Sequence, residues 1–350
     1  MLFSLIIPFS AAAEEEKEED VNAKEIIFEH VTDAYSWHIT AVNGHSISIP
    51  LLCIVKGNDG WDFFSASKFG HESNMKYKNY YICHDDTSLN SGKIVEDVNG
   101  EVVKPLDLSI TKNVLSIFII NGILIFVFLT IAKRYKENPL SAPKGMQAYL
   151  EPLVITIYED VAKACIGKNY KKFAPFILTA FFFIFLTNLM GIIPFFPGGA
   201  NITGNITVTM ILALATFVLT NFTGTKLYWK DIFWPDVPTW LKFPLPIMQS
   251  IEIIGLFTKP IALMIRLFAN MLSGHMMQLV LICLIFMLAK ISPLVGGGVS
   301  IVSVALAVFM DLLEVLVCLI QAYVFVTLSS IFIGLSQEEE EGETEVKKSK

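Results

Sequence analysis

The chain is poor in charge: only 17% of its 350 residues are Asp, Glu, Lys or Arg, whereas 53% are hydrophobic. Its apolar residues also lack the alternation or helical periodicity that would place one face of an element against a soluble core. They stand in blocks, and several blocks reach the roughly 20 residues that cross a bilayer core of about 30 Å. The sequence therefore excludes a large soluble domain and predicts an all-α polytopic membrane protein.

Motifs of several other functional classes are missing. The chain has no phosphate-binding loop, so we expect nucleotide chemistry to lie elsewhere. It has no series of arginines at three-residue spacing, which a voltage sensor needs. It also has no Ser-His or paired-Asp motif of an intramembrane protease. We expect no catalytic chemistry of its own, no cofactor, no metal and no nucleic-acid partner.

The N-terminal third differs from the rest. Residues 1–13 form a short apolar run with small residues before an acidic cluster, as in a secretory signal, although the positive n-region is missing. We favour a cleaved signal; the alternatives are a short interfacial helix or a misassigned start site. Residues 14–110 are polar, and alternation around Asn43-Gly44 predicts a hairpin. We expect a small exported β-containing domain, in which a Cys53–Cys83 disulfide is chemically allowed but not required.

Residues 111–337 form the expected membrane domain. Its apolar segments predict about five membrane-embedded helices: Asn113–Ala132, Phe173–Phe195, Ile206–Phe222, 248–288 and 298–335. The segment Met146–Lys168 is too polar to span, which predicts an amphipathic helix at the membrane surface. The last residues, 338–350, form a charged cytoplasmic tail.

Basic residues predict the orientation. The loop after the first span carries Lys133, Arg134, Lys136 and Lys144, and such clusters stay in the cytoplasm. With five spans, the N-terminal domain then lies outside and the C-terminus inside.

The most unusual residue is Arg266, in the middle of the apolar stretch 248–288. Charge at this depth is costly, so it usually faces a protein interior or an aqueous path, and a guanidinium does not release its proton. Snorkelling to the interface is the alternative, but apolar residues extend two turns on both sides. At about 100° per residue, Asn270 and Glu252 lie within about 40° of Arg266, whereas His275 points the opposite way. Small residues that would allow close approach line the arginine face: Gly255, Ala262, Ala269 and Ser273.

The final stretch carries Asp311, Glu314 and Gln321. The two acids among them, together with Glu252 and His275, supply groups that titrate, or can be tuned to titrate, near neutral pH. A purely structural alternative is hydrogen bonding between helices. For the whole set we favour a proton path.

These residues resemble the signature of subunit a of the F-type ATP synthase. That family has an acid fourteen positions before an arginine, a Lys-Pro pair between them, and a titratable residue seven positions before a glutamine on the last helix. The matching residues here are Glu252, Lys259-Pro260, Arg266, Asn270, Glu314 and Gln321. The resemblance is strongest over residues 145–337. Some relatives carry an acid at the position of His275 and a histidine at that of Glu314, which implies that these two residues lie close together.

The resemblance implies a mechanism and partners. A ring of proteolipid c subunits would turn against the Arg266 face, and two offset half-channels would feed its carboxylates. Asn270 and Asp311 would be further path residues beside Glu252, His275, Glu314 and Gln321. The last two long helices would lie strongly tilted around the ring. The expected setting is the bacterial inner membrane, with the peripheral stalk subunit b and the rest of the ATP synthase complex as partners. A secondary transporter is the competing class, but it usually shows two related halves, and the sequence shows no repeat.

Overall fold

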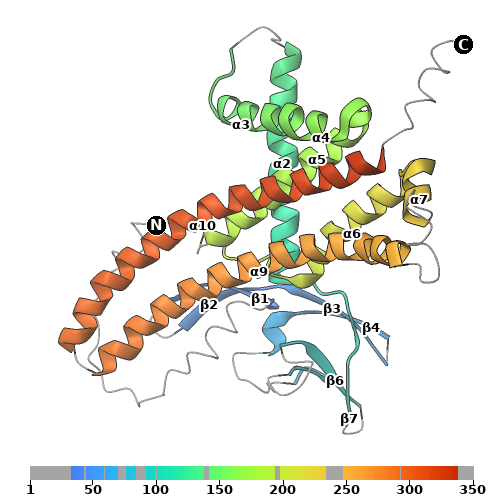
Figure 1. Cartoon of the computed structure of the whole chain (residues 1–350). Helices are drawn as coiled ribbons and strands as arrows, with labels where there is room; N and C mark the ends of the chain where they lie inside the picture. The colour runs from blue at the N-terminus through green and yellow to red at the C-terminus, as the bar shows by residue number, and fades with distance from the viewer. Residues whose placement is uncertain are drawn as a thin grey trace, which may run out of the picture.

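The computed structural model describes residues 33–42, 45–58, 60–69, 76–83, 92–98, 101–137, 142–193, 198–233, 247–291 and 293–337. The expected signal (1–13) and the charged tail (338–350) lie outside these ranges. The described chain has a small β-containing N-terminal region followed by helices to its C-terminal end, as predicted (Figure 1).

The N-terminal region contains three small antiparallel sheets, ordered β1-β2, β4-β3-β8 and β5-β6-β7. In the first, Val42 pairs with His45, which confirms the predicted hairpin; its Asn43-Gly44 turn lies outside the described residues. The strands are β1 (Ser36–Val42), β2 (His45–Pro50), β3 (Leu52–Gly57), β4 (Gly60–Ser65), β5 (Tyr80–Ile82), β6 (Ile94–Val98), β7 (Glu101–Val103) and β8 (Leu106–Asp107).

The core of this region joins two of the sheets. Cys53, Val55 and Phe64 on β3 and β4 are buried against Tyr80 and Ile94 on β5 and β6. No disulfide links Cys53 to Cys83, so the bridge that the sequence allowed is not formed.

Hydrogen bonds join the N-terminal β-region to the first long helix. The Asp33 carboxylate accepts hydrogen bonds from the N–H groups of Ala34 and Asn113, each 3.1 Å. The N–H of Lys112 donates to the Ala34 carbonyl at 2.9 Å. Burial raises the pKa of Asp33, and its hydrogen bonds to Thr111, Asn113 and Ala34 oppose that shift. These contacts fix the β-region at the point where the helix begins.

The helices are α2 (Lys112–Glu137), α3 (Met146–Ile155), α4 (Ala164–Ile166), α5 (Tyr170–Ile192), α6 (Ile206–Phe222), α7 (Lys226–Phe233), α9 (Ile247–Ile291) and α10 (Pro293–Ser336). By length and composition, three stretches of the described chain could cross a membrane: Lys112–Glu137, Met146–Ile192 and Val302–Ser336. A fourth candidate is the bent pair α6 and α7. The chain is therefore a multi-pass membrane protein.

The segment between α3 and α4 is helical throughout and includes a π-helix, Thr156–Lys163. Ile157 and Val161 are buried, whereas Glu159 and Asp160 are exposed. This separation of apolar and charged sides agrees with the amphipathic helix expected over this segment.

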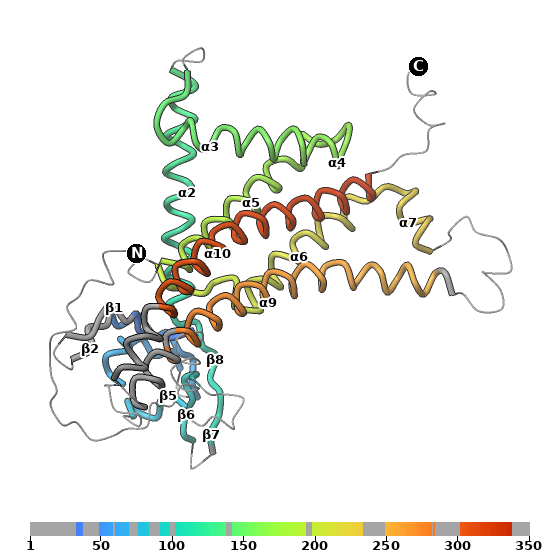
Figure 2. Tube along the Cα trace, turned by 60° about the vertical axis from the view of Figure 1, so that its left-hand side comes forward, coloured from blue at the N-terminus to red at the C-terminus, as the bar shows by residue number. Residues whose placement is uncertain are grey.

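The two longest helices, α9 and α10, lie side by side and cross α2 obliquely (Figures 1 and 2). Their shared core with α5 includes Leu263, Leu267, Phe325, Phe181 and Ile177. At about 1.5 Å per residue, the 45 residues of α9 span about 68 Å, roughly twice the thickness of a bilayer core. The packing of α9 on α10 and α6 decides which of its side chains are buried and which stay on the surface.

Candidate functional site

Arg266 lies on the open face of α9. Its side chain is exposed, as are the small side chains of Ala262, Ala269 and Ser273 on the same face. Within the part of the chain that the structure describes, no carboxylate forms an ion pair with the guanidinium. The predicted smooth face with one fixed charge is therefore present and available to a partner.

Gln321 on α10 contacts the helical turn of α9 that contains Arg266. Its amide Nε2 donates a long hydrogen bond, 3.5 Å, to the backbone carbonyl of Arg266. The bond goes to the backbone, and within the described residues no hydrogen bond of the guanidinium itself is found. The structure thus brings together two residues that are 55 positions apart in sequence.

A polar cluster lies between α9 and α10, C-terminal to Arg266. The amide of Gln278 donates to one carboxylate oxygen of Asp311 at 2.7 Å. Asp311 is buried, and its other oxygen, Oδ2, has no hydrogen-bond partner among the described residues. A buried polar atom without a partner is costly, so such a site favours water or a further polar group.

Glu314 and His275 extend this cluster. An added Cβ on Gly274 would lie 2.7 Å from Glu314 Oε1, so the carboxyl occupies space that only a glycine leaves open. His275, the next residue, turns toward α5, where its Nε2 would be 3.4 Å from a Cβ added to Gly191. Neither Glu314 Oε1 nor His275 Nε2 has a hydrogen-bond partner within the described chain. Within the described chain, Glu314 thus packs against Gly274 while His275 faces α5.

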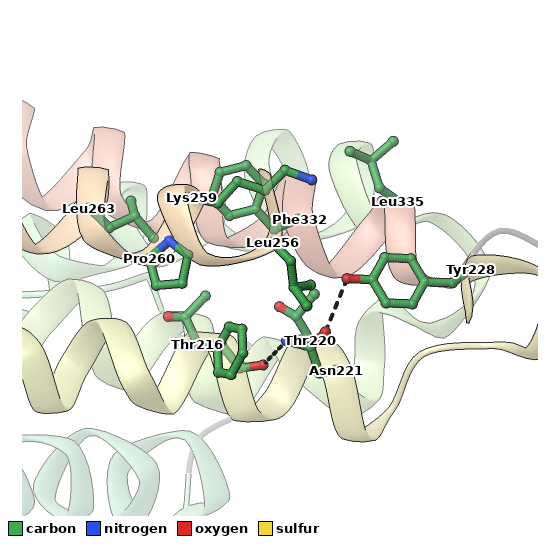
Figure 3. Close-up of a pocket in the computed structure, with 11 residues that line it drawn as sticks. Thr216, Thr220, Asn221, Tyr228, Leu256, Lys259, Pro260, Leu263, Phe332 and Leu335 are labelled. Carbon is green, nitrogen blue, oxygen red and sulfur yellow. Dashed lines mark hydrogen bonds between the residues drawn. The ribbon is translucent and has the colours of Figure 1, made fainter. Parts of the chain in front are cut away.

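A second polar region lies on the other side of Arg266 along α9. A pocket opens between α6, α7, α9 and α10 (Figure 3). In it, the Tyr228 hydroxyl donates to the Asn221 amide oxygen at 3.2 Å. Lys259 lies over the Phe332 ring, 5.6 Å from its centroid, and Thr220 Oγ1 is buried with no hydrogen-bond partner among the described residues. Glu252 lies one turn before Leu256, which lines the pocket.

Sequence reasoning did not single out several residues of these regions. Gln278 and Gly274 belong to the polar cluster, and Asn188 on α5 accepts a buried hydrogen bond from Thr203 at 2.5 Å. Gln278 could have been noticed, because it is a polar residue one turn after His275 in an apolar helix. Gly274 gave no such signal, since its role depends on a side chain from α10. Asn270, in contrast, is half-buried near Arg266 as the periodicity predicted.

Comparison with known proteins identifies the family. The profile described as ATP synthase A chain matches residues 114–334. The chain belongs to the ATP synthase subunit a family. The match begins at the first span, earlier than the region of strongest resemblance that the sequence motifs suggested. Subunit a is the proton-channel stator component of the F0 membrane part of ATP synthase, and it has no catalytic chemistry of its own.

Individual relatives support the same family assignment. The chain is 43% identical to ATP synthase subunit a of Chlorobium phaeobacteroides over 255 residues, which cover 69% of this chain and 71% of the relative. It is 41% identical to ATP synthase subunit a 2 of Prosthecochloris aestuarii, covering 79% and 83% of the two chains. For ATP synthase subunit a of Myxococcus xanthus the identity is 40%, over 69% and 77%. The β-containing region matches a separate profile, a domain of unknown function (DUF8433), over residues 26–108.

Proposed function

We propose that Arg266 faces a rotating ring of proteolipid c subunits and separates two offset proton half-channels. The observation that carries this proposal is the placement of an exposed, unpaired arginine between two separate polar regions of α9. At about 1.5 Å per residue, Lys259 lies about 10 Å before Arg266 along the helix, and His275 about 14 Å after it.

The arginine acts as a fixed charge. It attracts an ionised ring carboxylate and keeps it deprotonated, because a nearby cation favours the charged form. The small side chains around it allow the ring to approach closely. A proton therefore cannot pass directly between the two polar regions and must ride the ring. Each elementary charge that crosses 100 mV supplies about 2.3 kcal/mol, which drives the rotation.

The two polar regions serve as the half-channels. His275 and Glu314, with Asp311 and Gln278, form one path, and their unpartnered buried atoms are sites for water. Glu252 and the pocket beside Lys259 form the other. Asn270 and Gln321 hold the turn around Arg266 between them. Buried polar atoms without a hydrogen-bond partner among the described residues occur in both regions and support this assignment.

The whole chain fits the same arrangement. Five helices, α2, α5, α6, α9 and α10, are embedded in the bacterial inner membrane, and α9 and α10 are strongly tilted around the ring. The α3–α4 segment lies at the cytoplasmic surface, where the peripheral stalk subunit b would also be anchored. Residues 1–13 act as a signal, 14–110 form the exported domain, 111–337 form the membrane domain, and the tail 338–350 is cytoplasmic.

The test is removal of the fixed charge. We expect Arg266→Ala to abolish ATP-driven proton pumping while the complex still assembles, because the ring carboxylate loses its counter-charge. Arg266→Lys is expected to fail as well, since an ammonium is a compact point charge without the planar fork of a guanidinium. Pumping is measured with a pH-sensitive dye in membrane vesicles. Near-normal pumping by either variant would overturn the proposal.

A further inference from the structure

The sheet formed by β4, β3 and β8 has two unlike faces. Side chains alternate between the faces of a strand, and directly opposite pairs share a face. Cys53, Val55 and Phe64 point into the core. On the other face, five large apolar side chains are 45% to 67% exposed: Leu52, Trp61, Phe63, Leu106 and Leu108. These five residues and Lys56, which lies on the same side of β3, are here named the outer face.

The outer face is one continuous patch. Phe63 pairs with Ile54 across β3 and β4, and Lys56 pairs with Trp61 on one side and Leu106 on the other. The N–H of Leu108 donates to the carbonyl of Ile54 at 2.9 Å. Contiguous apolar surface of this kind marks an interaction site, whereas scattered exposed apolar residues do not.

The outer face begins at the membrane boundary. The N–H of Ile110 donates to the Leu52 carbonyl at 2.9 Å, and Ile110 is two residues before the start of α2. Two extended residues span at most about 7 Å. A bilayer has a headgroup layer of about 5–8 Å on each side of its hydrocarbon core. Since α2 is a candidate span, Leu52 lies at about the level of the headgroups.

The direction of the outer face follows from the layering. The inner face of this sheet is covered by β5 and β6, through Tyr80 and Ile94. Figure 1 shows β6 and β7 farther from the helices than β3 and β4, and Figure 2 shows the whole β-region below the lower end of α2. The face opposite β5 and β6 is therefore turned toward the side of the helices, which is the side of the bilayer.

We propose that the outer face rests on the lipid bilayer beside α2, with Trp61, Phe63 and the leucines at the level of the headgroups. The chemistry fits a lipid surface. Aromatic side chains, Trp above all, concentrate at this depth, and lysines reach from apolar surface toward lipid phosphates. Lys56 is exposed, and its Nζ lies 5.7 Å from the centre of the Trp61 ring. The β-region would then be held against the membrane by its sheet as well as by its link to α2.

The experiment uses the assembled ATP synthase complex in lipid nanodiscs, with a nitroxide spin label on Phe63→Cys. Relaxation by oxygen, which concentrates in lipid, is compared with relaxation by a water-soluble nickel chelate. Phe126→Cys on α2 is the lipid-facing reference, since Phe126 is exposed on a candidate span. Lys76→Cys is the aqueous reference within the same β-region, where the lysine side chain is 53% exposed.

The native thiol of Cys53 gives little background in the β-region. Burial raises the pKa of the Cys53 thiol to about 11, so it stays protonated and slow to react with the label near neutral pH. Any remaining signal is measured on the unsubstituted complex and subtracted. A second label, at Leu106→Cys on β8, tests the same face from another strand and covers the case in which Phe63→Cys disturbs the sheet.

We expect the oxygen-to-nickel ratio at Phe63→Cys and Leu106→Cys to be clearly higher than at Lys76→Cys and lower than at Phe126→Cys, because the outer face lies at headgroup depth and Phe126 lies deeper in the span. A ratio equal to that of Lys76→Cys would show that the outer face lies in water and would overturn the proposal. Labels shielded from both reagents would overturn it too, because they would show that a protein surface covers the face.

Discussion

In the proposed mechanism, Arg266 and the pair His275 and Glu314 perform different tasks because their side chains differ in whether they can exchange a proton. The guanidinium keeps its charge, whereas imidazole and carboxyl groups gain and lose protons in a range that their surroundings set. The structure places Glu314 against Gly274, one residue from His275, and leaves both titratable side chains with an unpartnered buried atom within the described chain. The shared proton path that we propose would account for these unpartnered atoms.

This arrangement predicts coupling between the two residues. We expect His275→Ala and Glu314→Ala each to slow proton flux strongly, and the double variant to lose less than the sum of the two effects. Residues that share a network typically show interaction energies of about 0.5–3 kcal/mol. Passive proton flux through the membrane sector, measured in vesicles stripped of the catalytic head, checks the prediction.

An exchange variant gives a sharper test. His275→Glu combined with Glu314→His restores the two chemical groups at exchanged positions and is expected to recover more flux than either exchange alone. Strictly additive losses, with no recovery in the double exchange, would assign the residues to separate paths.

At the scale of elements, a ring that turns against α9, as proposed, would constrain the face around Arg266 by motion as well as by contact. Ala262, Ala269 and Ser273 leave it smooth, and all three are exposed in the chain by itself. A rotating interface needs low barriers at every step, so a bulky side chain here should slow turnover even where assembly survives. The constraint acts through shape and not through charge.

Enlarging Ala269 tests this constraint. We expect Ala269→Phe to lower coupled ATP synthesis, since overpacking a tight contact typically costs about 1–3 kcal/mol. Ser250→Phe is the matched control: Ser250 is also exposed on α9 but lies about 160° from Arg266 around the helix. ATP synthesis is measured in membranes with the complex quantified. A native rate in Ala269→Phe would mean that no rotor meets this face.

The C-terminal end of α10 connects elements that are distant in sequence. A Cβ added to Gly334 would lie only 2.0 Å from the Cys165 carbonyl oxygen, so α10 approaches α4 as closely as a glycine allows. The amide of Gln337 donates to the Thr223 carbonyl at 2.6 Å, and the N–H of Thr225 donates to the Ser336 carbonyl at 2.9 Å. The amphipathic segment and the α6–α7 turn are thus both fastened to the end of α10.

At the scale of the whole molecule, the polar β-region and the charged tail belong on opposite sides of the membrane if the chain crosses it five times. The basic loop after α2 and the signal-like start support the same orientation. The proposed arrangement therefore makes a prediction about access that does not depend on the mechanism of proton transfer.

Access can be tested with an impermeant maleimide on intact inner membranes. We expect Lys76→Cys in the β-region to be labelled from outside, and Lys350→Cys in the tail only after the membrane is opened. The loss of the Lys76–Asp97 ion pair should matter little, because exposed pairs contribute about 0–1 kcal/mol. The unsubstituted chain reports background labelling. Labelling of the tail from outside would reverse the orientation.

The sequence by itself determined the membrane class, the β-containing N-terminal region and the open face of Arg266. These features are local: run length gives a span, alternation gives a strand, and the period of 3.6 residues places small side chains beside the arginine. Residues within a few turns of one helix keep their angular relations wherever that helix packs. For this reason the order of residues placed Ala262, Ala269 and Ser273 on the face of Arg266, whereas the packing of α9 left that face exposed.

Only the tertiary structure decided which polar groups meet. Gln278 reaches Asp311 across 33 positions, and Glu314 fits against Gly274, because α9 and α10 pack in one register. That register depends on the packing of α5, α6, α9 and α10 together, which no local pattern encodes. The outer face of the sheet that contains β3 also depends on tertiary structure. Alternation predicts two faces for a strand, but the layers that pack around the sheet determine which face stays uncovered.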